Sequence, residues 1–83
     1  MDFVVVDVET ANADPASICQ VGIVGFRDGQ VVDTWESLVD PEGLFAPFNV
    51  SIHGITPQMV AGAPTFPPLH PELDSWFGGR VVV

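Results

Sequence analysis

The sequence has very few basic residues, a single cysteine and no long apolar run. Two arginines and no lysine stand against eleven acids, which gives a net charge of −9. This composition excludes a nucleic-acid-binding surface built on basic side chains, because such surfaces pair Lys and Arg with phosphates. If the protein handles nucleic acid, something else must neutralise the phosphate, and divalent metal is the obvious candidate.

The single cysteine, Cys19, excludes an intrachain disulfide. It lies between Ile18 and Val21 in an apolar stretch, where it is predicted to be a small buried hydrophobe and not a nucleophile. A chain without disulfides fits a reducing compartment, so we expect a cytoplasmic location.

No apolar stretch reaches the ~18 residues that a membrane-spanning helix needs. The N-terminus lacks the basic start and apolar core of a signal peptide. We therefore expect no membrane partner. At 83 residues the chain has room for one small domain, although its hydrophobic content of 47% is rich for that size.

Three strands are predicted in the first half of the chain. The apolar run Phe3–Val6 opens a strand over Asp2–Glu9, and an unbroken run of this kind is typical of a strand covered on both faces. Strand composition returns over Ile18–Arg27 and Gln30–Val39, and Asp28-Gly29 between them favours a tight hairpin turn. These segments predict an antiparallel meander.

Two helices and a last strand are predicted in the second half. After a loop over Leu44–Gly54, Thr56-Pro57 marks the start of a short helix, with Thr as N-cap and Pro in the first turn. A second helix is predicted over Pro68–Phe77, because its apolar residues recur at helical spacing. Arg80–Val83 begins a strand that is reached through a helical crossover, so it should lie parallel to its neighbour. The fold class is therefore α/β, a mixed sheet with helix packed on it.

Asp7 and Glu9 directly follow the first apolar run and are the strongest candidates for chemistry. Residues i and i+2 of a strand face the same way, so both project together, roughly 6.5–7 Å apart. Two carboxylates so placed repel each other unless a cation lies between them. Mg²⁺ and Mn²⁺ prefer oxygen ligands, and two such ions stabilise the oxygens of a phosphoryl transfer. The alternative is a pair of ordinary solvated acids at a strand end.

The segment Phe3–Thr10 resembles the first motif of the DEDD (DnaQ-like) 3′–5′ exonuclease superfamily, in particular the group of the DNA polymerase III epsilon subunit and ribonuclease T. Ser51–Val60, followed by Ala63–Phe66, resembles the His-Gly-Ile-Thr segment, short helix and Ala-Pro-x-Phe of that family. Ile18–Val24 and Phe26–Val39 fit its second and third strands in order and spacing. The resemblance thus covers nearly all 83 residues.

The resemblance implies a ribonuclease H-like fold and hydrolysis of the 3′-terminal phosphodiester of DNA or RNA. It implies that Asp7 and Glu9 are catalytic residues and ligands in a two-metal site for Mg²⁺ or Mn²⁺. The implied partner is the 3′ end of a single-stranded nucleic acid, and a DNA polymerase is a further partner that the family suggests.

The resemblance also implies a substrate pocket. The backbone and hydroxyl around Thr10 and Ala11 would hold the terminal nucleotide and its 3′-OH. Ile52 and His53 would line the pocket for the last base or sugar, with His53 in substrate contact and not in catalysis. Judged from the residues alone, His53 is equally compatible with a surface or capping role.

The chain also departs from the family pattern. The family uses four acids and a general-base His or Tyr. Asp7 and Glu9 match two of the acids, whereas the other two acids and the base have no counterpart in residues 1–83. Residues 1–83 are therefore expected to be the N-terminal portion of one exonuclease domain, lacking the C-terminal half and inactive alone. His70 lies within the second predicted helix and is expected to be solvated. Gln20 stands where many relatives carry an acid.

A non-catalytic binding or assembly module with a ribonuclease H-like fold is the alternative function. The unfinished apolar strand Val81–Val83 and the exposed apolar surface that it should leave favour this alternative. The sequence leaves the oligomeric state open. It also leaves DNA and RNA open as substrates, because nothing in it is suited to recognise a 2′-OH.

Overall fold

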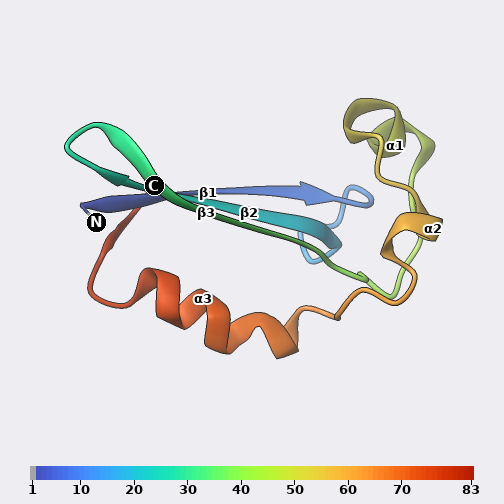
Figure 1. Ribbon diagram of the computed structural model, residues 1–83. Helices are drawn as coiled ribbons and strands as arrows, with labels where there is room; N and C mark the ends of the chain where they lie inside the picture. Colours follow the sequence, from blue (N-terminus) through green and yellow to red (C-terminus); the bar gives the residue numbers. More distant parts are fainter. Residues whose placement is uncertain (1) are drawn as a thin grey trace.

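The computed structural model describes residues 2–83 and contains one four-stranded sheet with a helix along one face (Figure 1). The strands are β1 (Phe3–Thr10), β2 (Ile18–Arg27), β3 (Gln30–Leu38) and β4 (Val81–Val82). Their order across the sheet is β3-β2-β1-β4. The first three strands pair antiparallel and β4 pairs parallel to β1, which confirms the predicted meander and crossover.

The register of β1 against β2 fixes which side chains share a face. Val4 lies opposite Gly25 and Val6 opposite Ile23, whereas Asp7 lies opposite Gly22 and Glu9 opposite Gln20. Because residues alternate between faces, the even-numbered valines of β1 and the two acids lie on opposite sides of the sheet. The pairing shifts between Glu9 and Thr10, so the regular ladder ends directly after the acids.

Two of the helices match their sequence signals. The helix α2 (Pro57–Val60) begins with the Thr56 hydroxyl accepting a hydrogen bond from the Met59 N–H, as the Thr-Pro pair predicts. A 3₁₀ turn over Pro67–Leu69 leads into α3 (His70–Phe77). The second predicted helix is thereby confirmed, with a tighter first turn where prolines remove backbone donors.

The prediction of a loop over residues 44–54 is wrong, because the helix α1 (Pro47–His53) occupies most of it. Its start has Pro47 in the first turn, and its end has Gly54 in the left-handed conformation at φ 74°. No residue of α1 is buried. Its apolar pair Phe48 and Ile52 spans a single turn, which is too short to mark an amphipathic helix in a sequence.

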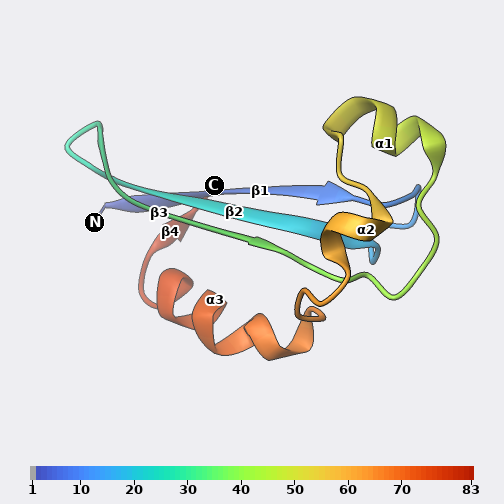
Figure 2. The same cartoon turned by 45° about the vertical axis from the view of Figure 1, so that its right-hand side comes forward.

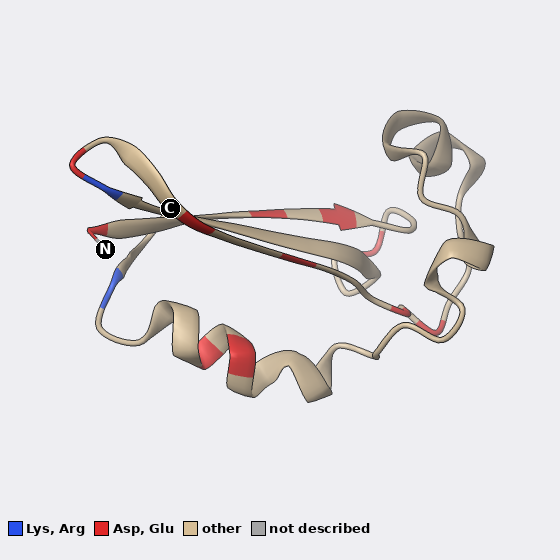
Figure 3. Ribbon diagram, viewed as in Figure 1, with Lys and Arg blue, Asp and Glu red and all other residues tan. Residues whose placement is uncertain are grey.

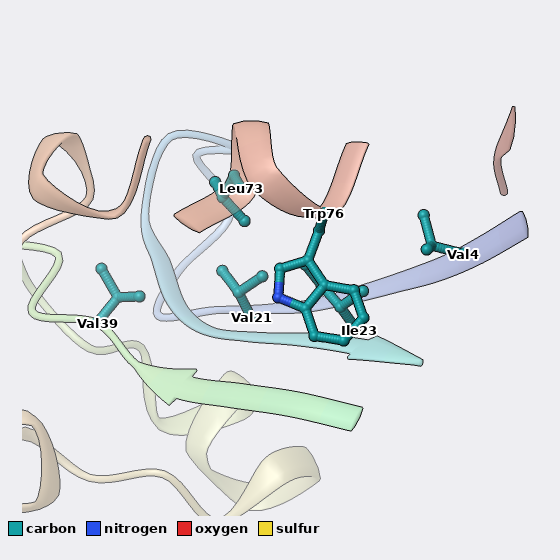
Figure 4. Packing of buried hydrophobic residues seen from close by; sticks show 6 residues of the cluster. All are labelled: Val4, Val21, Ile23, Val39, Leu73 and Trp76. Carbon is teal, nitrogen blue, oxygen red and sulfur yellow. The ribbon is translucent and has the colours of Figure 1, made fainter. Parts of the chain in front are cut away.

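The main core lies between the sheet and α3 (Figure 4). Leu73 and Trp76 of α3 pack onto Ile23, which is only 1% exposed, and onto its neighbours in β1 and β2. The buried members of this cluster are Val4, Val21, Ile23, Val39, Leu73 and Trp76. The face that α3 covers is thus the one opposite the two acids.

A second, smaller cluster lies where β1 ends and the α2 segment returns. It consists of Ala11, Cys19, Ile55 and Val60. Cys19 is fully buried there, so its prediction as a small buried hydrophobe is confirmed. This cluster anchors the segments on both sides of α1 to the end of the sheet.

The molecule has two layers, one sheet and one helix, and its shortest dimension is 19 Å. Figure 2 shows α3 beneath the sheet, and α1 and α2 close to the end of β1, with α1 on the side away from α3. Within residues 2–83, no helix runs along the other face of the sheet in either view (Figures 1 and 2). No helix of residues 2–83 has the length and apolar character to cross a membrane.

Candidate functional site

Asp7 and Glu9, hereafter the acid pair, lie on the helix-free face at the end of β1. Asp7 is exposed and Glu9 is half-buried. Gly22 lies opposite Asp7 and contributes no side chain, so solvent reaches the aspartate from the β2 side. The predicted joint projection of the two carboxylates from one strand end is what the strand register shows.

The two arginines of the chain lie at the other end of the sheet (Figure 3). Arg27 follows the residue that pairs with Phe3, and Arg80 precedes the strand that pairs with Phe3, so both lie beside the start of β1. The acid pair lies at the end of the same strand. Its mutual repulsion is therefore not offset by an arginine, and a cation from solution fits the arrangement.

Carboxylate oxygens at this spacing suit a hard divalent ion such as Mg²⁺ or Mn²⁺. Within the part of the chain that the structure describes, no group of three or more His, Cys, Asp or Glu side chains could hold a metal ion. The acid pair therefore fits as two ligands of a metal site and does not form a complete site.

The backbone around Thr10 and Ala11 is largely engaged within the protein. The Ala11 N–H donates to the Ser17 carbonyl at 2.8 Å, and the Ala11 carbonyl accepts from the Ala46 N–H at 2.8 Å. The Thr10 carbonyl accepts from the side chains of Asn49 and His53. Of the groups predicted to hold a terminal nucleotide, the Thr10 hydroxyl is the one whose proton is free to be donated.

His53 uses both ring nitrogens in hydrogen bonds. The Ile55 N–H donates to Nδ1 at 2.9 Å, so Nδ1 carries no proton. The proton is therefore on Nε2, which donates to the Thr10 carbonyl at 2.9 Å. With both nitrogens occupied, only the ring face of His53 is free for a substrate, and its predicted substrate contact stays a prediction.

Ile52 lies on α1 next to His53 and is 66% exposed. Its side chain is therefore accessible, and its contact with the last base or sugar, which the resemblance implies, stays a prediction. Phe48, one turn earlier on α1, is 73% exposed. The outward side of α1 is thus apolar.

Cys19 lies behind Glu9. Burial, and then the nearby Glu9 carboxylate, raise the pKa of the Cys19 thiol. Its sulfur is 4.0 Å from Nε2 of His53. The thiol is thus held neutral and enclosed, which agrees with a packing role.

Asn49 is the residue of this region that sequence reasoning missed. Its Nδ2 donates to the Thr10 carbonyl at 3.1 Å and lies 3.5 Å from the Thr10 hydroxyl oxygen. A spacing of four residues from His53 is the one local signal, and it has meaning only once residues 47–53 are known to be a helix.

The other histidine and the open cleft beside α3 lie away from the acid pair. His70 is exposed, as predicted, and its ring meets the edge of Phe66 at a centroid distance of 5.5 Å. The cleft, of about 240 Å³, is lined by Asp33, Glu72, Ser75, Trp76 and Arg80. The indole N–H of Trp76 already donates to Glu72, and the guanidinium of Arg80 already donates to carbonyls at the end of α3.

Comparisons with known proteins identify the family of the chain. The exonuclease family model (RNase T) matches residues 4–83. DNA polymerase III PolC-type of Clostridium perfringens is 32% identical over 85 residues, and that of Thermotoga petrophila is 31% identical over 83 residues. These alignments cover 99% and 98% of this chain, but only 6% of each relative.

Among solved structures, Exonuclease X in complex with 5′ overhanging duplex DNA has a similar fold, with a TM-score of 0.79 and 27% identity. The match covers 98% of this chain and 54% of that chain. This chain thus spans about half of the Exonuclease X chain and a small part of the PolC-type relatives. The chain belongs to the exonuclease family of DEDD (DnaQ-like) type and has its ribonuclease H-like mixed sheet.

Proposed function

We propose that the acid pair binds divalent metal in a 3′–5′ exonuclease that hydrolyses the 3′-terminal phosphodiester of a nucleic acid. The observation that carries this proposal is the position of the pair. Both carboxylates leave the same face of β1 at its end, on the face without a helix, while both arginines lie at the other end of the strand.

In this proposal the residues near the acid pair hold and orient the substrate. The Thr10 hydroxyl would donate to the terminal sugar, and Ile52 would pack against the terminal base. The ring face of His53 would border the same pocket. Bound Mg²⁺ or Mn²⁺ would supply the positive charge that offsets the phosphate and the charge developing on its oxygens.

The remaining acids and the general base of such an enzyme are not supplied by the residues described here, because the acid pair stands without a third metal-binding side chain in residues 2–83. We therefore propose that the 83-residue chain is inactive by itself. The names of the PolC-type relatives support a DNA polymerase as partner, and the DNA complex of Exonuclease X supports DNA over RNA as substrate. A cytoplasmic location belongs to the same proposal.

The test compares Asp7→Asn and Glu9→Gln with the wild type in the full-length protein. Each change removes one carboxylate at nearly constant size, so we expect weaker Mn²⁺ binding in calorimetry and turnover reduced on the order of 10²-fold or more. Release of label from the 3′ end and not from the 5′ end of a single-stranded oligonucleotide would establish the direction.

Glu42→Gln is the matched control, because it removes the same charge from an exposed position in the turn after β3. It should leave Mn²⁺ binding and turnover unchanged. Unchanged metal binding and turnover in Asp7→Asn would contradict the proposal and would favour the non-catalytic assembly module instead.

A further inference from the structure

Hydrogen bonds link the helix α1 to the end of β1. None of its residues is buried. Its start is fixed by the Ala46 N–H, which donates to the Ala11 carbonyl at 2.8 Å. Its inward side is fixed by Asn49 and His53. Because the second apolar cluster anchors only the segments that flank α1, the position of the helix itself relative to the end of β1 depends on these polar contacts as well.

Asn49 and His53 converge on one acceptor. Nδ2 of Asn49 lies 3.1 Å, and Nε2 of His53 2.9 Å, from the Thr10 carbonyl oxygen. The two residues are four apart on α1, so they lie on the same side of the helix one turn apart. A carbonyl oxygen has two lone pairs, and these two donors fill them. We call this arrangement the Thr10 clamp.

The clamp lies between the acid pair and the substrate side of α1. Thr10 directly follows Glu9, at the point where the regular pairing with β2 shifts. Ile52, which is exposed, lies on the same helix between the two clamp residues. The clamp therefore sets the position of Ile52 relative to the acid pair, and the Asn49 amide, 3.5 Å from the Thr10 hydroxyl oxygen, also favours one orientation of that hydroxyl.

We propose that Asn49 is a positioning residue for the nuclease reaction. Through the Thr10 clamp it holds the terminal nucleotide in register with the metal ligands Asp7 and Glu9, without touching the substrate itself. This inference rests on the function proposed above. It assigns Asn49 to the placement of the substrate and not to the binding of metal, since its amide is directed at Thr10 and not at a carboxylate.

Two variants of the full-length protein test the donor role of Asn49. Asn49→Ala removes the amide and its volume, and Asn49→Leu removes the N–H donors while keeping a similar size. A misplacement of about 1 Å can cost a factor of about 10² in rate. We expect both variants to lower kcat about tenfold or more, with KM and the calorimetric Mn²⁺ dissociation constant each within about threefold of the wild type.

Ser51→Ala is the matched control on the same helix. The Ser51 hydroxyl donates to the Phe48 carbonyl at 2.6 Å, so this change also removes a side-chain hydrogen bond of α1, but none to Thr10. It should leave kcat unchanged. The thermal midpoints of all three variants are measured by circular dichroism, and kinetics are run well below the lowest midpoint.

Three results would overturn the inference. One is wild-type kcat in Asn49→Ala. Another is wild-type kcat in Asn49→Leu, which would show that size and not the donor matters. The last is a fraction of unfolded protein large enough to account for the lost turnover. If Asp7→Asn abolishes activity and Asn49→Ala does not, this inference fails and the proposed function stands; if Asp7→Asn is fully active, the proposed function itself fails.

Discussion

At the scale of single residues, the acid pair and Cys19 show how position in the fold decides chemistry. Asp7 and Glu9 stand on the open face, whereas Cys19 is enclosed directly behind Glu9. Burial first, and the Glu9 carboxylate second, raise the pKa of the Cys19 thiol. The same glutamate that is proposed to attract a metal cation therefore disfavours a second anion beside it.

This shift predicts both the reactivity of Cys19 and an alkaline loss of stability. The raised pKa favours the neutral thiol in the folded protein. The stability that this neutral thiol contributes is therefore fully present below the unfolded pKa of a cysteine, about 8.5, and is lost as the pH rises through the higher folded pKa. In urea titrations between pH 8 and 10, the wild type should lose more stability than Cys19→Ala.

Reaction with a thiol reagent checks the same residue independently. At pH 8 the folded protein should react far more slowly than the protein in urea, because the thiol is both neutral and enclosed. Equal rates in the two conditions would show that Cys19 is accessible, contrary to its burial.

Asp7, Glu9 and Cys19 could be interpreted from the sequence because each signal is local: an apolar strand followed by alternating acids, and a cysteine among hydrophobes. Asn49 could not. Its partner Thr10 is 39 residues away in sequence, and a lone asparagine between Phe48 and Val50 is compatible with many local structures. Only the fold brings the two together.

At the scale of elements, helices with an apolar stripe or a cap were predictable and α1 was not. Leu73 and Trp76 mark α3, and Thr56-Pro57 marks α2. In α1, by contrast, the apolar residues Phe48 and Ile52 face solvent, and polar residues face the sheet. This arrangement reverses the usual pattern of a surface helix, and two apolar residues four apart are too few to establish a helical period in the sequence.

The cap of α2 gives a stability prediction. Thr56→Ala removes the acceptor for the Met59 N–H and should lower the free energy of unfolding by about 1 kcal/mol. Thr56→Ser keeps the oxygen and should retain most of it. Urea unfolding of the two variants provides the measurement, and equal stability of Thr56→Ala and the wild type would show that the cap is unimportant.

The end of α3 gives a second prediction. Nη1 of Arg80 donates to the carbonyls of Ser75 at 3.1 Å and Trp76 at 2.8 Å, which are otherwise unpaired at the helix end. Arg80→Ala should therefore cost about 1 kcal/mol of stability. Arg27→Ala removes the same charge from an exposed position in the hairpin and should cost much less.

Unfolding at two salt concentrations separates the two possible causes. Loss of hydrogen bonds in Arg80→Ala should persist at 1 M salt, where charge effects between exposed groups are screened. If the two arginine variants are equally stable, the contacts of Arg80 with α3 contribute nothing measurable.

At the scale of the whole molecule, one thin core carries most of the stability. The two layers meet only through the cluster around Ile23 and Trp76, and the helix-free face contributes to no buried cluster of residues 2–83 (Figure 4). Small domains bury a modest share of their surface, so their stability is marginal. The loss of one large core side chain is therefore a large fraction of the total.

Trp76→Ala tests this dependence. Removing a buried Trp costs about 3–5 kcal/mol, against about 5–15 kcal/mol for a whole domain. In a thermal melt, Trp76→Ala should already be largely unfolded at 37 °C. Val31→Ala, at a position 57% exposed, should still be folded at that temperature and should unfold cooperatively above it. A wild-type melting curve for Trp76→Ala would place the main core elsewhere.

The sheet topology was largely predictable at this scale, since a hairpin turn, a crossover and a right-handed connection leave few alternatives. The charge distribution was not, because composition counts two arginines without saying that both lie beside the start of β1. That separation depends on strand register, which long-range pairing sets.

The parallel pairing of β4 with β1 also determines when this sheet can be completed during translation. The Val83 N–H donates to the Val4 carbonyl and the Val6 N–H to the Val83 carbonyl, so β1, which is made early, waits for β4, which is made much later. Until the ribosome has released this segment, one edge of β1 stays unsatisfied and open to other nascent chains. This open edge is therefore an aggregation hazard in the nascent chain until β4 docks on it.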